Sequence, residues 1–251
     1  MLNRIASVGH WAAFTFGSIG PTLGAVVRPS WWGRPFYGVL IGGLPLAVVA
    51  GLALGIVVWV HTRGVLARTG TGAVEFLPTF LAAAVLLELA PLGAGLIVAA
   101  RTGASLAAEL AAMRVGEQLD ALELLGVSAR RRLIGPRILA CILAAPLLYV
   151  VIAAVALGGG FVAELVAGQT TWLKYSRAAM GDLRLIDVVP AAMKTFAFGA
   201  LVGVTGCFAG VAAKDGSEGV GQAATHGVVA SVLLVLAADV FLVSLIRVLF
   251  G

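Results

Sequence analysis

Four ionisable residues lie within or at the edge of long apolar runs: Glu88, Glu164, Lys194 and Asp239. A charge at the centre of a bilayer costs roughly 2.5–3.5 kcal/mol on insertion scales, so such residues face protein or a water-filled cavity. There they can contact a lipid headgroup or relay protons. Alternatively, they can form internal salt bridges, or a protonated acid can hydrogen-bond to the backbone. Both interpretations stay open for the set.

The surroundings of two of these residues favour different roles. Glu88 precedes Pro91 by three residues, and a proline frees a backbone carbonyl and can kink its helix. This pattern predicts that Glu88 faces a cavity. Lys194 lies about six residues into its apolar run, so we expect its long side chain to snorkel to the outer interface. For Glu164 and Asp239 the sequence does not distinguish the two roles.

Residue sets that would support catalysis or metal binding are missing from the chain. His10, His61 and His226 are far apart in sequence, and Cys141 and Cys207 lie in apolar runs without a Cys-x-x-Cys pair. The sequence contains no Gly-x-x-x-x-Gly-Lys-Ser/Thr phosphate loop. We therefore expect no catalytic site, no metal site and no cofactor in this chain, so that any ATP chemistry belongs to a separate subunit.

A charged island at residues 109–132 interrupts the apolar sequence. Within it, Glu117, Asp120 and Glu123 recur at three-residue spacing. On a helix over residues 113–125 these acids share one side. A short polar helix between two apolar runs must lie in water, so its charge pattern indicates a partner.

The opposite side of that predicted helix is apolar, with four residues gathered there: Val115, Leu119, Leu122 and Leu125. Leu124 projects among the acids, where water gives it no advantage. Gly126 suits the left-handed position past a helix end, and Ser128 is a candidate cap for the next helix, which begins with Arg130–Arg132. A solvated loop helix and a docking helix both fit this pattern.

The composition is that of a membrane protein. Hydrophobic residues make up 61% of the chain and charged residues 12%, and the mean hydropathy is +1.06. A bilayer core of about 30 Å needs about 20 apolar residues per helix, and several windows meet that length. The fold class is therefore all-α and polytopic, and the net charge of +5 reflects membrane topology and not a nucleic-acid partner.

The apolar runs predict five spans, at residues 37–60, 76–100, 133–158, 188–212 and 224–249. We expect one domain over residues 1–251, with an interfacial N-terminal segment at 1–34 and a transmembrane bundle at 35–251. The third span has the composition to continue to Val166. A short polar connection is expected at residues 61–75 and a small surface helix within 168–187, on the periplasmic side.

Basic residues define the expected orientation. Ten Lys and Arg residues lie on the side that holds the N-terminus and the charged island, against six on the other side. The positive-inside rule places that first side in the cytoplasm. Trp31 and Trp32, next to Arg28 and Arg34, are expected to anchor the chain at headgroup level. A bacterial inner membrane is the simplest location, because the N-terminus has no signal-peptide pattern.

Several segments closely resemble the permease family called MlaE or YrbE, the membrane subunits of ABC transporters linked to MCE proteins. They are Glu88-Leu-Ala-Pro91, Ala100-Arg-Thr-Gly-Ala104, Ala108-Glu-Leu-Ala-Ala-Met-Arg114, Glu117-Gln-Leu-Asp-Ala-Leu-Glu-Leu-Leu-Gly-Val127, Pro136-Arg137, Lys194-Thr-Phe-Ala-Phe-Gly199, Gly206-Cys-Phe-Ala-Gly210 and Gly219-Val-Gly-Gln-Ala-Ala-Thr225. The resemblance covers about residues 75–250 in order and spacing, and residues 1–74 only in layout.

The resemblance implies a homodimeric or pseudo-dimeric permease that moves lipids, namely phospholipids or related lipids, between the inner membrane and a periplasmic MCE-domain protein. A cytoplasmic ABC ATPase, which binds the ATP and Mg, powers it. The island then matches the family's coupling helix, and six residues are implied to dock on the ATPase: Arg114, Glu117, Gln118, Asp120, Glu123 and Leu124.

The candidates for the lipid cavity are Leu87, Glu88, Pro91 and Asp239. Leu87 departs from the family, which commonly has arginine just before the Glu-Leu-x-Pro motif. Any contact of that arginine with a lipid headgroup or an acid is therefore absent here or made by another residue.

Two other functions are compatible with the residues alone. An ion- or proton-coupled secondary transporter would use Glu88, Lys194 and Asp239, although five unrepeated spans fit its repeated halves badly. A scaffold that only anchors the ATPase would need the docking helix and no lipid path.

Overall fold

The computed structural model describes residues 2–69, 73–167, 170–181, 184–214 and 216–250. Over these ranges the chain is helical without strands, and five helices are long and apolar enough to cross a membrane. These candidate spans are Pro29–Arg68, Val74–Val115, Arg130–Val166, Ile186–Val211 and Gly216–Val248. Each predicted span overlaps one of them, so the all-α, multi-pass architecture is confirmed.

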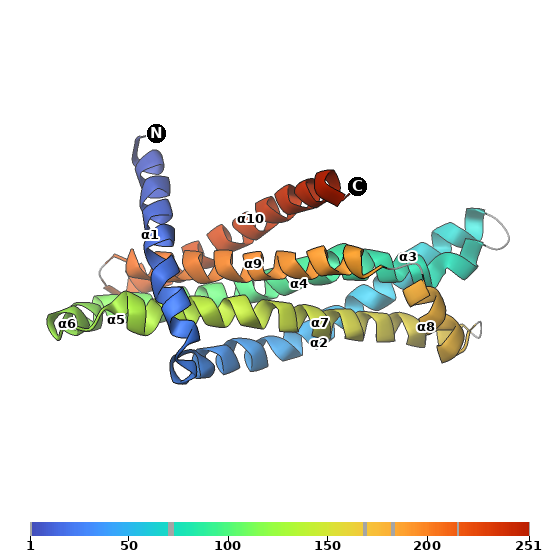
Figure 1. The fold of residues 1–251 in the computed structure, drawn as a ribbon, viewed down its shortest axis with the longest axis horizontal. Coiled ribbons are helices and arrows are strands. Elements are labelled where there is room, and N and C mark those ends of the chain that lie inside the picture. The colour runs from blue at the N-terminus through green and yellow to red at the C-terminus, as the bar shows by residue number, and fades with distance from the viewer. Residues whose placement is uncertain (1, 70–72, 168–169, 182–183, 215, 251) are drawn as a thin grey trace. The chain divides into compact units, whose positions relative to one another are not determined.

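Figure 1 follows the helices by colour along the chain. The α-helices are α1 (Leu2–Val26), α2 (Pro29–Thr69), α3 (Leu77–Ala84), α4 (Ala90–Ile97), α5 (Ala104–Val115), α6 (Gln118–Leu124), α7 (Gly135–Val166), α8 (Trp172–Gly181), α9 (Leu185–Val211) and α10 (Gly216–Phe250). A 3-10 turn, η1 (Ala73–Phe76), precedes α3. Three π-helical turns are η2 (Val85–Leu89), η3 (Val98–Gly103) and η4 (Arg130–Ile134). The small helix predicted within residues 168–187 is α8.

The chain forms two compact units, each with its own buried core. The first unit contains residues 1–43, 95–145 and 196–251, and its fully buried side chains include Phe198 and Val235. The second unit contains residues 44–94 and 146–195, and its fully buried side chains include Leu81 and Ile152.

Glycines on one face of α9 allow close helix contacts in the first unit. Gly199 lies against the backbone of Cys141 on α7, and a Cβ at Gly203 would lie 2.9 Å from the Cα of Ile138. Farther along the same helix, a Cβ at Gly210 would lie 2.6 Å from a Cβ on α5. Small residues let backbones approach in lipid, where apolar side chains gain little by leaving the bilayer. This stripe explains part of the high glycine content.

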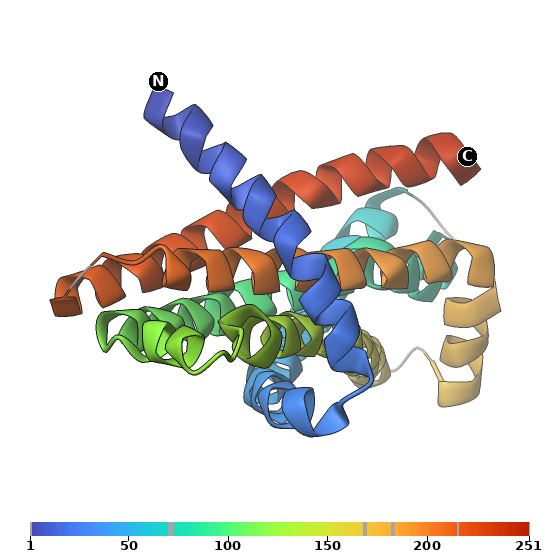
Figure 2. The ribbon, with the colours of Figure 1, turned by 60° about the vertical axis from the view of Figure 1, so that its left-hand side comes forward.

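Helix α1 packs against η4, at the beginning of α7, within the first unit (Figure 2). The Arg130 guanidinium carbon lies 5.7 Å from the centre of the Phe14 ring, and that ring meets Phe208 edge-on with centroids 5.5 Å apart. A Cβ at Gly135 would lie 2.6 Å from the carbonyl oxygen of Pro21. The N-terminal segment is therefore a helix with specific tertiary contacts.

The second unit holds α8 against α3 through an aromatic residue. Tyr175 is buried with Ala179 against Ala82, and its hydroxyl donates to the Leu157 carbonyl at 3.3 Å. The Thr79 hydroxyl donates to a carbonyl of α8 at 2.8 Å. These contacts tie the small helix to the longer ones.

Two of the π-helical turns directly precede a proline. Turn η2 ends two residues before Pro91, and η4 ends two residues before Pro136. Proline has no N–H and its ring collides with the carbonyl four residues earlier in a regular helix. A wider turn relieves that collision, and the N–H of Ala90 accordingly reaches back five residues to the Val85 carbonyl. The chain thus passes each proline without ending the helical segment.

The short polar connection predicted at residues 61–75 is wrong over most of its length, because α2 continues to Thr69. His61 and Arg63 lie inside this helix. Arg63 stays there because its charge is compensated by an acid on α7 in the second unit. Charge alone is therefore a poor indicator of where the helix ends.

The single helix predicted over residues 113–125 is also wrong. Helix α5 ends at Val115, and α6 begins only at Gln118. Between them Glu117 has φ of +56°, a left-handed conformation that a regular helix does not contain. The preceding Gly116 has low helix propensity and allows the chain to turn. Gly126, with φ of +74°, has the left-handed conformation predicted for it.

Candidate functional site

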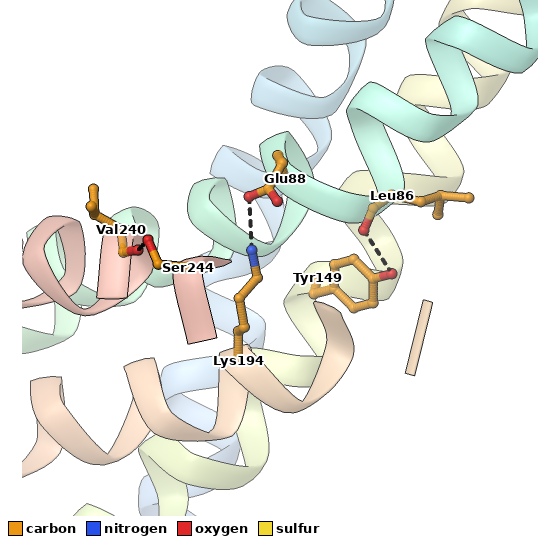
Figure 3. Close-up of polar contacts among 6 residues, drawn as sticks. All are labelled: Leu86, Glu88, Tyr149, Lys194, Val240 and Ser244. Carbon is orange, nitrogen blue, oxygen red and sulfur yellow. Dashed lines mark hydrogen bonds and ion pairs between the residues drawn. The ribbon is translucent and has the colours of Figure 1, made fainter. Parts of the chain in front are cut away.

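An ion pair joins Lys194 of α9 to Glu88 of η2 within the second unit, as Figure 3 shows. The Lys194 Nζ lies 2.7 Å from the Glu88 Oε2, with the lysine side chain 2% exposed and the glutamate side chain 47% exposed. The expectation that Lys194 snorkels to an interface is therefore wrong, because a carboxylate from another helix compensates its charge. The pair buries a cation and leaves one side of a carboxylate open.

A hydroxyl group from α7 completes the turn that carries Glu88. In the π-helical register the donor for the Leu86 carbonyl would be residue 91, and Pro91 has no N–H to give. The Tyr149 hydroxyl donates to that carbonyl instead, at 3.2 Å (Figure 3). The carbonyl that the proline was expected to free thus has a specific partner, and this partner fixes the turn against α7.

The four lipid-cavity candidates are distributed over both units. Leu87, Glu88 and Pro91 lie along one short stretch of η2 and α4 in the second unit, where Leu87 is half-buried. Asp239 lies on α10 in the first unit and is half-buried. Figure 3 also draws the next turn of α10, where the Ser244 hydroxyl donates to the Val240 carbonyl at 2.8 Å.

Glu164, whose role the sequence left open, forms an internal network in the second unit. Its Oε2 accepts from the Trp59 indole N–H at 2.6 Å and from Arg63 Nη1 at 3.1 Å. The same arginine lies over the Trp59 ring, 5.3 Å from its centre. Burial, with a smaller contribution from the Glu164 charge, raises the pKa of Tyr175 on α8 to about 12. Glu164 is therefore a buried structural acid, held by two donors from α2.

The segment predicted to dock on a partner consists of the end of α5 and the exposed short helix α6, which an ion pair joins. Arg114, on the last turn of α5, places its Nη1 2.6 Å from Asp120 Oδ1 on α6. This pair spans the left-handed turn at Glu117 and joins α6 to α5. Gln118 and Glu123 are exposed. Two of the predicted docking residues therefore compensate each other's charge within the chain.

The leucines of α6 separate into a buried and an exposed group. Leu119 is buried, as predicted, whereas Leu124 is 90% exposed and Leu125 is 78% exposed. The prediction that Leu125 shares an apolar face with Leu119 is wrong, because α6 ends at Leu124 and Leu125, at its C-cap, departs from the regular helical wheel. The free surface of this segment consequently carries two adjacent leucines beside Glu123.

Two cavities lie in the first unit, and the four lipid-cavity candidates are not among their lining residues. One, of about 720 Å³, is mainly apolar and lies among α1, α9 and α10, with Trp11, Phe208 and His226 in its wall. The other, of about 590 Å³, is polar and is lined by Arg34, Arg101, Glu109, Arg137 and neighbouring residues of α2, η3 and α5.

Tyr149 and the arginines of the polar cavity are site residues that the sequence did not single out. A lone tyrosine in an apolar run is one available signal, since its hydroxyl needs a partner when buried. Arg101 and Arg137 stand in the motifs quoted above, but their convergence depends on three separate segments. The periodicity of residues within one segment gives no information about which segments converge in the fold.

Known proteins match most of the chain. The family model for Permease MlaE matches residues 33–245. A probable ABC transporter permease protein of Rickettsia typhi is 30% identical over 240 residues, which cover 96% of this chain and 92% of the relative. The intermembrane phospholipid transport system permease protein MlaE of Haemophilus influenzae is 28% identical over 211 residues, covering 82% and 76%. The chloroplastic protein TRIGALACTOSYLDIACYLGLYCEROL 1 of Arabidopsis thaliana is 36% identical over 165 residues, covering 65% and 47%.

These matches agree with the architecture. The matched region begins within α2 and ends within α10, so it includes all or part of each of the five candidate spans. It also contains α6 and the turn that carries Glu88. The chain is a multi-pass membrane protein and belongs to the MlaE family of ABC transporter permeases.

Proposed function

We propose that the chain is the permease subunit of an ABC transporter that moves phospholipids or related lipids. In this proposal a separate cytoplasmic ATPase supplies the energy, a periplasmic MCE-domain protein exchanges lipid with the permease, and two permease copies form the transporter. The family assignment and the name of the Haemophilus influenzae relative support the substrate class. The observation that carries the coupling part of the proposal is the exposed surface of α6.

Helix α6 has the features that a docking element needs. Its orientation is fixed at one end by the left-handed Glu117 and the Arg114–Asp120 ion pair, and at the other end by Gly126. Its outer surface presents Leu124 and an adjacent leucine, which lose contact with water only if a partner covers them. A rigid segment transmits the movement of an attached ATPase to α5, whereas a flexible loop would absorb it.

Charges around the exposed leucines give the surface its selectivity. Glu117 and Glu123 are exposed acids on this segment, and a basic groove on the ATPase would complement them. Such charge pairs set register and partner choice more than affinity. The apolar contact of Leu124 would then provide most of the binding free energy.

The lipid path in this proposal includes the turn at Glu88. Its carboxylate is half exposed, and Lys194 holds it in one orientation. An open carboxylate beside a buried ammonium can hydrogen-bond a polar headgroup without burying a new net charge. Alternating access during the ATPase cycle would bring lipid to and from this turn.

The proposed location is the bacterial inner membrane, with the N-terminus and α6 in the cytoplasm and α8 in the periplasm. The bias of Lys and Arg toward the side of the charged island supports this orientation. Helix α1 is outside the five candidate spans of the described residues, which fits an interfacial position.

Co-purification of the full-length permease with the ATPase of its own transporter tests the docking role. The double variant Glu123→Lys, Leu124→Ser changes only exposed side chains, so we expect a normal melting temperature and at least a tenfold loss of bound ATPase. Glu75→Lys, at an exposed acid outside α6, is the charge-matched control and should retain the ATPase. Recovery of intact ATPase at wild-type stoichiometry with the double variant would refute docking through α6.

Lipid movement requires a second measurement on the same preparation. In vesicles that contain the permease and its ATPase, transfer of a fluorescent phospholipid should require ATP and persist in the presence of a proton uncoupler. Transfer without ATP that an uncoupler abolishes would instead favour the secondary transporter. An intact assembly that moves no lipid would favour the scaffold.

A further inference from the structure

The polar cavity of the first unit is positively charged. Arg34 of α2, Arg101 of η3 and Arg137 of α7 converge on it, together with Glu109 of α5. Three guanidinium charges and one carboxylate charge leave a net charge of +2. Its volume of about 590 Å³ falls within the range of roughly 300–1,000 Å³ that is usual for ligand pockets. The charge and the size are those of an anion site.

One arm of a buried guanidinium in this cavity has no partner. Arg137 is 8% exposed, and its Nη2 donates to Glu109 Oε1 at 2.6 Å. Its Nη1 is buried and makes no hydrogen bond to any residue that the structure describes. A buried donor of a charged group that is left unsatisfied is costly, so such donors generally have a partner. This unsatisfied donor belongs to a residue that lines the cavity.

Arg101 presents a second guanidinium to the cavity. Its Nη1 donates to the Gly38 carbonyl at 3.3 Å, and the group lies against Gly42 of α2, where a larger residue would displace it. Arg101 belongs to the π-helical turn η3. Unlike η2 and η4, this turn is not followed two residues later by a proline that would explain it. Wide turns of this kind are common at functional sites. The chain therefore holds the Arg101 guanidinium in one place while leaving it exposed.

The cavity lies toward the N-terminal ends of two candidate spans. Arg34 lies five residues after the first residue of its candidate span, and Arg137 lies seven residues after the first residue of its own. At 1.5 Å per residue these distances are roughly 8 and 10 Å. Trp31 precedes Arg34 by three residues, and the guanidinium carbons of Arg28 and Arg132 lie 4.5 and 4.6 Å from the centre of its ring. Tryptophan of this kind marks the headgroup level.

We infer that this cavity binds the phosphoryl group of a membrane phospholipid headgroup. Phosphate oxygens accept paired hydrogen bonds from the planar guanidinium, so Arg137 and Arg101 are the groups that would hold the phosphate. Phosphate suits a site of net charge +2 near the ends of candidate spans, and the acyl chains of the lipid would remain in the bilayer. The site shares no residue with the Glu88 turn or with α6, and it goes beyond the proposed function.

Native mass spectrometry of the full-length protein in a mild detergent tests this site. Phosphatidylglycerol is added in one arm, and diacylglycerol with the same acyl chains in another. A third arm measures the binding of radiolabelled inorganic phosphate by equilibrium dialysis. The variants are Arg101→Gln and Arg137→Gln, and the control is Arg131→Gln, an exposed arginine on the neighbouring turn η4. Melting temperatures report whether each variant is folded.

We expect the wild type and Arg131→Gln to retain phosphatidylglycerol in preference to diacylglycerol. Arg101→Gln and Arg137→Gln should weaken that binding about 10-fold to 100-fold, the range for one lost charge-assisted hydrogen bond. If Arg137→Gln does not fold, Arg101→Gln, whose side chain is exposed, still decides the question. Retention of phosphatidylglycerol by folded Arg101→Gln at the wild-type level overturns the inference. If inorganic phosphate binds in an arginine-dependent way but phosphatidylglycerol is not preferred over diacylglycerol, the inference that the phosphoryl group belongs to a membrane phospholipid is overturned.

Discussion

Removing the carboxylate of the Glu88–Lys194 pair should destabilise the protein more than removing the ammonium. The variant Glu88→Gln takes away the charge 2.7 Å from an ammonium that is 2% exposed. Breaking a fully buried pair in this way costs about 3–5 kcal/mol. Because the glutamate side chain is 47% exposed and screened, we expect about half of this cost, or about 2 kcal/mol.

The reverse change has a smaller effect for a physical reason. Lys194→Met replaces a buried cation with an apolar side chain of similar length, and it leaves behind a carboxylate that is half exposed to its surroundings. A change of this type stays within about 1 kcal/mol of the wild type. In the double variant, Lys194→Met has already removed the buried cation. The added destabilisation that Glu88→Gln causes in the wild-type background should therefore disappear.

Thermal unfolding of the purified protein in detergent measures these differences. A loss of about 2 kcal/mol corresponds to a fall of about 4–8 °C in the melting temperature of a chain of this size. Glu75→Gln, at an exposed pair with Lys174 whose charged atoms are 3.7 Å apart, is the control and should shift the melting temperature very little. Equal destabilisation by Glu88→Gln and Lys194→Met, or strict additivity in the double variant, would refute the reasoning.

Two further predictions concern packing. Gly199→Val should prevent folding of the first unit or lower its stability by several kcal/mol, because a side chain at this position meets the Cys141 backbone. Size-exclusion chromatography measures the outcome. A monodisperse variant with the wild-type melting temperature would contradict the prediction. Tyr175→Phe should cost about 1 kcal/mol, through loss of the hydrogen bond to the Leu157 carbonyl. Limited proteolysis should then cleave α8 faster, and an unchanged cleavage rate would count against that role.

The sequence predicted the elements well where the pattern is local. The five apolar runs each coincide with a candidate span, because a helix that crosses lipid must be apolar along its own length. Gly126 has the left-handed conformation that its position after an amphipathic stretch indicated. The small helix α8 also lies within the predicted segment.

The predictions failed where a local pattern was extended past a point at which the backbone changes direction. The helical wheel over residues 113–125 assumed an unbroken helix, whereas Glu117 is left-handed and Leu125 is exposed. Similarly, the charges at His61 and Arg63 suggested a loop, although Glu164 on another helix allows one of them to stay within α2. In both places the deciding contact or dihedral angle is invisible to periodicity.

The amino-acid sequence by itself determined the class of the protein, its spans and its family motifs, because hydropathy and residue order belong to each segment separately. Only the tertiary structure decided that Lys194 pairs with Glu88, 106 residues away in the chain, and that Tyr149 replaces the hydrogen-bond donor that Pro91 lacks. It also brought Arg34, Arg101 and Arg137 to one cavity. Such pairings depend on distances between side chains of different helices, which helix packing sets and which no single segment encodes.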